Sequence, residues 1–353
     1  MLPKSMKAVR IFEYGDPSVL QYVDAPLPET GDNDVLIKVG ATSVTGWDLK
    51  YRLGQIKAPP GRDPLPMPFQ LGRDMAGEVA AVGPKVTRFR ERDRVVGMVH
   101  PACGHCENCV RGYDNLCLDT RLPGHQAFGG YAEYVSRAET ELLPAPEGIS
   151  FDILGGFLWS YSTNWSIVQR RGNLHPGDAV LITGASGGMG TSAIDVCRFV
   201  GASHLIGTTG SSNKIERLQE LGCDYVVNYK DEDALDRVKS MSGRGGVDLV
   251  MDFVGGDMVG FGLNCLRMGG TFTVVGGSNL AEAPVPYRIM IGMAANIHGI
   301  RASKREDQRT ILRLLNEGKL NPVIDRVLPL KEAADAHQLL ERREQIGKIV
   351  LTP

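Results

Sequence analysis

Four cysteines lie close together in the chain and could hold one metal ion between them. Two residues separate Cys103 from Cys106 and Cys106 from Cys109, and Cys117 follows after seven more. Thiolates at this spacing predict a tetrahedral zinc site. Because four sulfurs complete the tetrahedron, such a zinc stabilises structure and carries out no chemistry. The alternative is a lobe that keeps the spacing without metal. His105, inside the lobe, is expected to face solvent.

A glycine-rich segment from Gly184 to Gly190 could bind a phosphate group. It follows an apolar stretch typical of a buried strand and precedes a helix expected to run through Val200. Glycines at such a turn let the backbone approach a pyrophosphate, which the N–H groups of the helix N-terminus then bind. The residues expected to contact the dinucleotide here are Ser186, Gly187, Gly188 and Met189. A tight turn without ligand is the alternative.

The end of the next strand distinguishes NADPH from NADH. An NAD enzyme usually carries Asp or Glu there to bind the ribose hydroxyls. This chain has no carboxylate at that point, and Ser211, Ser212 and Lys214 follow instead. Hydroxyls and a cation suit a 2′-phosphate, so the sequence predicts NADPH. Lys214 alone would equally fit a solvated lysine at a helix start.

A chain of 353 residues is expected to form two domains, and these domains must position the residues described above. Short alternating strands predict a β-rich domain over residues 1–150, with the cysteine lobe at about 100–118. Apolar strands then alternate with helices, which predicts an α/β domain with a doubly wound parallel sheet over residues 151–298. Residues 299–353 are assigned back to the first domain. The strands expected in the sheet are 179–183, 204–208, 225–227, 247–252 and 271–275.

Composition narrows the classes of partner. The net charge is −2, which gives no electrostatic basis for binding nucleic acid. No apolar run reaches the roughly 18 residues of a membrane span, and the N-terminus lacks the apolar core of a signal peptide. Three further cysteines in apolar stretches suit a reducing compartment. We therefore expect a cytoplasmic protein that acts on a small molecule, with no nucleic-acid or membrane partner.

Several further segments resemble one known superfamily. They are Gly72 to Val79, Gly129 to Val135, Asn228 to Lys230, Asp248 to Gly256 and Gly347 to Leu351. With the cysteine lobe and the glycine loop, they are similar to the medium-chain dehydrogenase/reductase superfamily, which includes the zinc alcohol dehydrogenases and quinone oxidoreductases.

The resemblance implies a GroES-like catalytic domain and a Rossmann domain, with the active site in the cleft between them. It also implies that Tyr229 lies near the adenosine 2′-phosphate. Phe253 to Gly255 and Val275 to Gly277, with Gly276 between, would flank the ribose and the nicotinamide. A homo-oligomer, either dimer or tetramer, is expected, with the strand from Thr271 to Val275 at a sheet edge.

The chain departs from the family at the ligands of the catalytic zinc. Thr45-Gly46 stands where the first ligand motif is expected, Arg73 lies in the second, and the third falls near Trp159. Thr, Arg and Trp cannot assemble a zinc site. We therefore expect one structural zinc per chain, in the cysteine lobe, and no catalytic zinc.

Without a Lewis acid, alcohol oxidation becomes harder, whereas hydride addition to a conjugated C=C forms an enolate that hydrogen-bond donors can stabilise. The sequence thus predicts an NADPH-dependent reductase of enones, enoyl compounds or quinones. Thr45, Arg73 and Tyr161, with Asp48 beside them, are the catalytic candidates. Their structural alternatives are a turn cap for Thr45, an ion pair with Asp48 or Asp74 for Arg73, and core packing for Tyr161.

Three other functions stay open at this point. The first is a carbonyl or imine reductase that uses protein donors in place of zinc. The second is a protein that binds NADPH without turnover. The third is a conventional zinc alcohol dehydrogenase, which would contain two zinc ions per chain.

Overall fold

The computed structural model describes residues 2–56, 66–276 and 283–353. Its contacts divide the chain into two compact units. The first unit contains Met1–Trp159, Ser303–Glu317 and Ile324–Pro353, and the second contains Ser160–Ala302 and Gly318–Val323. The expected combination of a β-rich part and a parallel α/β sheet is confirmed.

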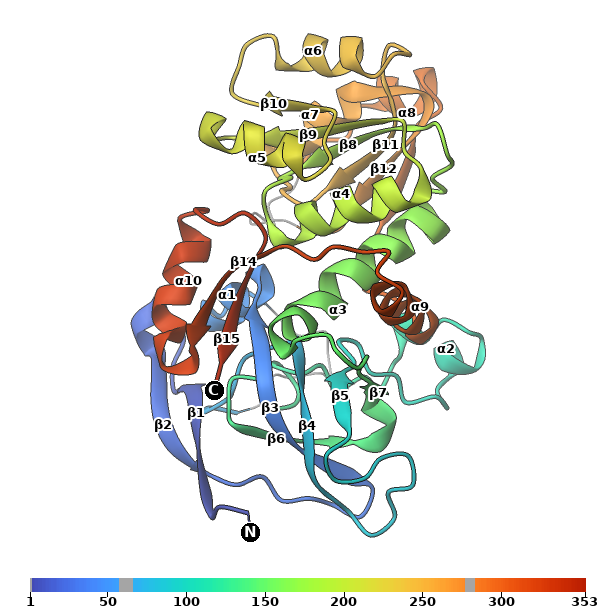
Figure 1. Cartoon of the computed structure of the whole chain (residues 1–353). Coiled ribbons are helices and arrows are strands. Elements are labelled where there is room, and N and C mark those ends of the chain that lie inside the picture. The colour runs from blue at the N-terminus through green and yellow to red at the C-terminus, as the bar shows by residue number, and fades with distance from the viewer. Residues whose placement is uncertain (1, 57–65, 277–282) are drawn as a thin grey trace. The chain divides into compact units, whose positions relative to one another are not determined.

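The first unit is built on a seven-stranded sheet in the order β14-β15-β3-β4-β5-β7, with β6 paired to β3 (Figure 1). Its long strand β3 pairs with β15, β4 and β6, so chain segments from both ends of the sequence meet on it. The strands are β3 Asp34–Val44, β4 Met75–Val82, β5 Arg94–Gly97, β6 Tyr134–Ala138, β7 Leu142–Pro144, β14 Ile324–Pro329 and β15 Lys348–Thr352.

A hairpin and several helices complete this unit. Strands β1 (Ser5–Ile11) and β2 (Leu20–Pro26) pair antiparallel. The helices are α1 Gly46–Arg52, α2 Glu107–Val110, α3 Phe151–Ser166, α9 Arg305–Asn316 and α10 Ala333–Glu341, of which α3 continues into the second unit.

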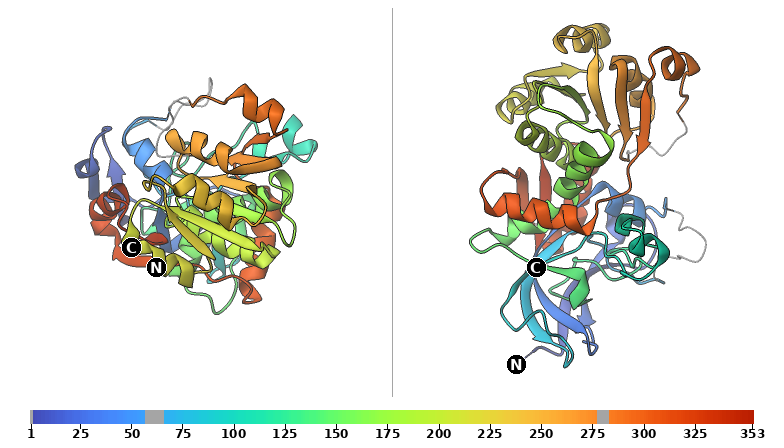
Figure 2. Two further views of the ribbon diagram at one scale, coloured as in Figure 1. Left: turned by 90° about the horizontal axis from the view of Figure 1, so that it is seen from above. Right: turned by 90° about the vertical axis from the view of Figure 1, so that its right-hand side faces the viewer.

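The second unit is a six-stranded parallel sheet in the order β10-β9-β8-β11-β12-β13. Helices cover both faces of the sheet (Figure 1 and Figure 2). The strands are β8 Ala179–Thr183, β9 His204–Thr209, β10 Tyr225–Asn228, β11 Val247–Asp252, β12 Leu266–Val274 and β13 Asn296–Gly299. The helices are α4 Gly188–Val200, α5 Ile215–Glu220, α6 Ala234–Met241, α7 Asp257–Cys265 and α8 Tyr287–Gly292.

The strand order of this sheet explains both its sequence pattern and its binding site. Every residue of the central strands β8 and β11 is buried, which accounts for their continuous apolar runs. The order reverses between these two strands, and ligands of doubly wound sheets bind at such a reversal, beyond the carboxyl ends of the strands. The glycine loop follows β8 directly, at this point.

The expectation that the strand from Thr271 to Val275 forms a sheet edge is wrong. Residues 271–274 lie in β12, and β13 pairs with them in parallel on the outer side. On this side of the sheet the edge strand among the described residues is therefore β13, whose Asn-Ile-His-Gly sequence gives little strand signal. The described helices include none that is long and apolar enough to cross a membrane.

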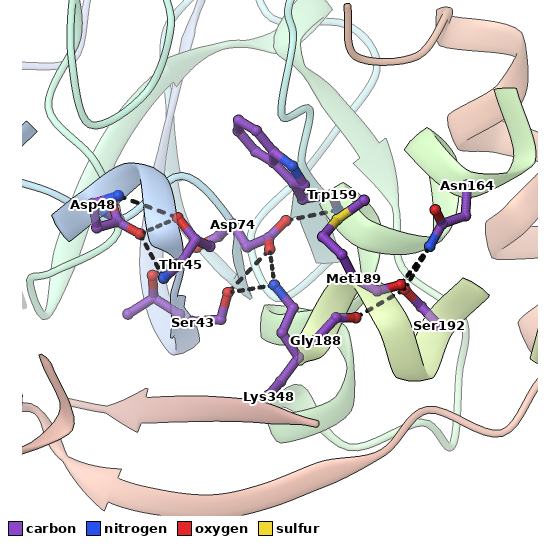
Figure 3. Close-up of polar contacts among 12 residues, drawn as sticks. Ser43, Thr45, Asp48, Asp74, Trp159, Asn164, Gly188, Met189, Ser192 and Lys348 are labelled. Atoms are coloured by element: carbon purple, nitrogen blue, oxygen red, sulfur yellow. Dashed lines mark hydrogen bonds and ion pairs between the residues drawn. The ribbon is translucent and has the colours of Figure 1, made fainter. Parts of the chain in front are cut away.

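A buried ion pair joins the C-terminal strand to the rest of the first unit. Lys348 of β15 donates to Asp74 at 3.2 Å and to Ser43 at 3.3 Å. The side chain of Asp74 is inaccessible and that of Lys348 is only 10% exposed. Asp74 also accepts from Ser43 of β3 at 3.0 Å and from the backbone N–H of Trp159 in α3 at 2.9 Å (Figure 3).

Replacement of Lys348 by methionine should destabilise the protein strongly, because it leaves the carboxylate of Asp74 buried without its cation. We expect the free energy of unfolding to fall by about 3–5 kcal/mol in urea titrations. The matched control is Lys85→Met. Lys85 forms a 2.9 Å pair with Asp32 at the surface, with the side chains 67% and 58% exposed, and its loss should cost at most about 1 kcal/mol. Equal effects of the two substitutions would contradict a structural role for the buried pair.

Candidate functional site

The four cysteines of the lobe converge to the geometry of a zinc site. Their sulfur atoms all lie within 4.8 Å of one another. The Sγ atoms of Cys103 and Cys109 are 3.9 Å apart, as are those of Cys106 and Cys117. A tetrahedron with Zn–S bonds of about 2.3 Å has S···S edges of roughly 3.8 Å, so the cluster fits one zinc ion. His105 is 78% exposed and points to Asp119 instead, as expected.

The lobe is attached to the N-terminus of α9. Asp114 accepts a hydrogen bond of 2.9 Å from the backbone N–H of Arg305, and the guanidinium of Arg305 donates to the carbonyl of Ala102 at 3.1 Å. Lys304 lies over the ring of Tyr113 at 5.4 Å. A metal that fixes the lobe therefore also fixes the start of this helix.

The glycine loop leaves the N-terminus of α4 open to an anion. Gly187 is the N-cap residue, and no side chain caps the helix there. Gly184 has a φ of +64°, which favours glycine. A Cβ at Gly190 would lie 2.4 Å from the carbonyl oxygen of Gly184, so only glycine lets the helix pack against the strand. The N–H groups of this terminus, including those of Gly188 and Met189, suit a pyrophosphate.

A buried asparagine, which the sequence analysis does not single out, supports this turn. Asn164 of α3 donates to the carbonyl of Met189 at 2.9 Å and to the hydroxyl of Ser192 at 2.8 Å. Ser192 in turn donates to the carbonyl of Gly188 at 2.9 Å (Figure 3). The only sequence signal for Asn164 is that it is a polar residue in an apolar helix. The sequence does not reveal its role, because its hydrogen-bond partners lie in α4.

Hydrogen bonds join the carboxyl end of β11 to that of β8. Thr183 donates to the carboxylate of Asp252 at 2.5 Å, and the backbone N–H of Gly255 donates to the same carboxylate at 3.1 Å. The N–H of Phe253 donates to the hydroxyl of Thr183 at 3.1 Å, and that of Val275 to the carbonyl of Asp252 at 3.2 Å. The segments expected beside the ribose and nicotinamide therefore lie at neighbouring strand ends. Gly276 follows directly, and Gly277 lies outside the described residues.

Tyr229 lies against the end of β9, where the adenosine ribose is expected. Its backbone N–H donates to the carbonyl of Thr209 at 3.1 Å, and a Cβ on Gly210 would lie 2.6 Å from its hydroxyl oxygen. Ser211 is exposed. Lys214 is only 6% exposed, so the alternative of a solvated lysine does not hold. Ser211 and Lys214 thus follow β9 directly, and Tyr229 contacts the end of the same strand.

The hydroxyl of Thr45 caps α1. It accepts from the backbone N–H of Asp48 at 3.3 Å, and the backbone N–H of Thr45 donates to the carboxylate of Asp48 at 2.9 Å, which completes a capping box. The hydroxyl itself donates to the same carboxylate at 2.6 Å. Asp48 also accepts from the N–H of Gly72 at 3.0 Å, and burial raises the pKa of its carboxyl group. The single proton of the Thr45 hydroxyl is therefore already bonded within the protein.

The structural alternative of a direct ion pair between Arg73 and Asp48 or Asp74 does not match the contacts of the described residues. Arg73 forms no ion pair with a carboxylate among the described residues, because Asp48 is bonded to Thr45 and Gly72, and Asp74 to Lys348. Its guanidinium lies 4.5 Å from the ring centre of Trp159 and 5.9 Å from that of Tyr51. It donates to the hydroxyl of Tyr51 at 2.9 Å and to the carbonyl of Val99 at 3.3 Å.

The position of Arg73 leaves one of its donors available. Arg73 is 3% exposed, and its Nε–H has no partner within the described parts of the chain. Burial lowers the pKa of the guanidinium, which the charges of Tyr51, Asp48 and Asp74 partly oppose. It stays charged at neutral pH all the same. A buried cation with an unused N–H is suited to an oxyanion.

Tyr161 has its phenol proton engaged. Its hydroxyl donates to Asp195 at 2.9 Å, and Asp195 also accepts from the backbone N–H of Asn321 at 2.6 Å. Burial raises the pKa of Tyr161 well above its usual value. These contacts lie within the second unit.

A histidine that no sequence pattern singles out, His125, packs beside this arginine. Its ring stacks on Tyr51 with ring centres 4.3 Å apart and planes 18° apart. Burial, together with the charge of Arg73, lowers the pKa of His125 to about 4.

Comparison with known proteins agrees with this arrangement. A model described as the alcohol dehydrogenase GroES-like domain matches residues 31–147, and one described as zinc-binding dehydrogenase matches residues 221–351. An NAD-dependent alcohol dehydrogenase of Sulfolobus acidocaldarius is 31% identical over 98% of this chain and 99% of its own. A quinone oxidoreductase of Sus scrofa is 30% identical over 99% of this chain and 98% of its own.

The chain belongs to the medium-chain dehydrogenase/reductase superfamily. A crystal structure of an NAD-dependent alcohol dehydrogenase superposes with a TM-score of 0.92 at 36% identity, covering 99% of this chain and all of the other. The protein is accordingly an oxidoreductase of this superfamily that uses a nicotinamide cofactor, and its four-cysteine cluster fits the structural zinc.

Metal analysis of the purified protein should give one zinc per chain. Removal of that zinc with a chelator should lower the thermal midpoint. It should also speed amide hydrogen exchange in two places, the lobe (102–118) and the first turn of α9, because Arg305 contacts Asp114 and Ala102.

Helix α4 in the second unit provides the internal control, and its exchange should not change. A count of two zinc ions would show that a second metal site exists. A metal-free protein with unchanged stability would show that the lobe holds no zinc.

Proposed function

We propose that this protein is an NADPH-dependent reductase of conjugated carbonyl acceptors, such as enones, enoyl compounds or quinones, that works without a catalytic zinc. The observation that carries the proposal is the buried guanidinium of Arg73. Arg73 and Trp159 both stand at positions where the family resemblance places ligands of the catalytic zinc. The guanidinium lies over the ring of Trp159, and its Nε–H has no partner among the described residues. Neither Thr45 nor these two residues can ligate zinc.

Such a site favours stabilisation of an enolate over that of an alkoxide. When bound, NADPH supplies a hydride to the β-carbon of the acceptor. Negative charge then develops on the carbonyl oxygen, and the Nε–H of Arg73 can donate to that oxygen while its charge offsets the developing one. The hydroxyls of Thr45 and Tyr161 already donate hydrogen bonds to Asp48 and Asp195. Arg73 is therefore the strongest of the three candidates as a hydrogen-bond donor to the substrate oxygen.

Replacement of Arg73 by methionine tests this assignment. We expect kcat/KM for 2-enones, enoyl thioesters or quinones to fall about 10²–10³-fold, the usual cost of losing one oxyanion donor. Arg73→Lys is the matched control, because it keeps the charge and loses the planar guanidinium, and it should retain intermediate activity. Steady-state assays with NADPH provide the measurement. Alcohol oxidation without turnover of any conjugated acceptor would refute the proposed function.

The preference for NADPH is proposed on the basis of Ser211, Lys214 and Tyr229 at the end of β9, where no carboxylate stands. Lys214→Met should lower kcat/KM for NADPH about 10–100-fold and change that for NADH less than about threefold, because a charge-assisted contact to the 2′-phosphate is lost. Lys319→Met is the control, since Lys319 is exposed in the same unit. Equal losses with both cofactors would point to damaged folding, and a wild-type preference for NADH would contradict the cofactor proposal.

A second candidate is the oxidation of alcohols, which the names of several relatives suggest. Within the described parts of the chain, groups of three or more potential metal ligands occur only in the cysteine lobe and at the adjoining Asp119. The zinc count described above separates this candidate from the reductase, and so does a panel of simple alcohols assayed with NAD⁺ and NADP⁺.

A further inference from the structure

Two of the buried histidines in the first unit, His125 and His337, differ sharply in their surroundings. His337 is fully buried, and both of its ring nitrogens have partners: Nδ1 lies 3.2 Å from Arg52 and Nε2 lies 3.0 Å from the hydroxyl of Tyr131. His125 is 4% exposed, and neither of its ring nitrogens has a partner among the residues that the structure describes. The ring of His337 is therefore held by hydrogen bonds, whereas among the described residues the ring of His125 has its stacking on Tyr51 and no hydrogen bond.

The loop that carries His125 is ordered by backbone contacts. The N–H of Gly124 donates to the carbonyl of Ala127 at 2.8 Å, and the N–H of His125 donates to that of Leu122 at 3.1 Å. A Cβ on Gly124 would lie 3.1 Å from the backbone nitrogen of Gly72, so this loop packs directly on the residue that precedes Arg73. Among the described residues, the imidazole is thus held in place without a hydrogen bond to its ring.

His125 and Arg73 meet on one tyrosine. His125 stacks on the ring of Tyr51, and Arg73 donates to the hydroxyl of that ring at 2.9 Å. Each of the two residues retains an unused nitrogen donor or acceptor that is buried. Buried polar groups without partners destabilise a fold, and a role in catalysis is one of the reasons for which native proteins retain them.

We propose that His125 is a further catalytic residue, whose ring N–H binds the carbonyl oxygen of the acceptor together with the Nε–H of Arg73. This inference rests on the proposed function and adds a second oxyanion donor to it. In the reaction the acceptor gains a hydride at its β-carbon and a proton from water at its α-carbon. Its C=C bond becomes single, and NADPH is oxidised to NADP⁺.

The role of His125 is that of a neutral donor. Its pKa of about 4 keeps the imidazole uncharged at neutral pH, because burial and the charge of Arg73 both oppose protonation. A neutral imidazole carries one N–H, which can donate to an oxyanion without transferring its proton. The protonation of the α-carbon is therefore assigned to water.

The test compares His125→Phe with His125→Asn. Phenylalanine keeps the stacking on Tyr51 and removes the N–H, so kcat/KM for 2-cyclohexenone should fall about 10–100-fold with KM for NADPH unchanged. Asparagine supplies an N–H again and should recover part of the loss. The thermal midpoint of His125→Phe should equal or exceed that of the wild type, because the ring of His125 has no hydrogen bond to any described residue. His175→Phe, at an exposed site in the second unit, is the control.

A lower thermal midpoint with unchanged kcat/KM would overturn the inference and make His125 a packing residue. A binding experiment separates this failure from that of the proposed function. Cyclohexanone, an unreactive analogue in the presence of NADP⁺, is titrated into the enzyme–NADP⁺ complex by calorimetry. His125→Phe should weaken its binding at least fivefold. If the wild type reduces no conjugated acceptor but this loss of binding occurs, the site stands and the proposed reaction fails. If the wild type turns over the acceptor and His125→Phe changes neither kcat/KM nor the affinity for cyclohexanone, the proposed reaction stands and the proposed role of His125 is wrong.

Discussion

The hydrogen bonds and the ion pair of the buried Asp74 carboxylate hold three separate segments of the first unit together. The carboxylate accepts from Ser43 in β3, from the backbone of Trp159 in α3 and from Lys348 in β15, three segments far apart in the chain (Figure 3). Three of the roughly four acceptor sites of this buried carboxylate are already used, and the charge of Lys348 already offsets its own. The neighbouring residue Arg73 therefore carries its charge into the interior without this acid as partner.

The second nearby acid is used in the same way. Asp48 accepts from Thr45 and from the N–H of Gly72, which fixes the start of α1 and the turn before Arg73. The guanidinium is left to the faces of Trp159 and Tyr51, which attract a cation through their ring quadrupoles. That attraction is weaker than a buried ion pair, so the positive charge stays available to a ligand. A buried cation without an ion-pair partner lowers the stability of the fold, and proteins tolerate such a loss chiefly at functional sites.

The parts of this protein that the sequence predicts well are those specified by local pattern. The cysteine spacing and the glycine loop each lie within one short stretch of consecutive residues, and the structure shows the convergence that their spacing requires. The pairing of Arg73 could not be predicted, because it depends on Lys348, which is 274 residues away from Asp74. The edge strand β13 could not be predicted either, because four residues with two polar side chains give almost no periodic signal. His125 has no local signal at all, since only the burial of its ring distinguishes it.

The cysteine lobe and the proposed metal-free site differ in how they depend on the chain. The lobe draws its four cysteines from one short segment, so this cluster does not depend on distant parts of the sequence. The proposed site draws Thr45, Arg73 and Trp159 from distant segments, and an arginine among them opposes a dication. The guanidinium of Arg73 is positively charged, as a zinc ion would be, but it acts on an oxygen atom in a different way.

That difference decides which oxygen the site can stabilise. A zinc ion can lower the pKa of a bound alcohol enough to form an alkoxide, whereas a guanidinium, always protonated, can only donate hydrogen bonds to an oxygen that already bears charge. In the proposed reaction that charge arrives with the hydride and is delocalised over the enolate, which is the case that a guanidinium can serve without a metal.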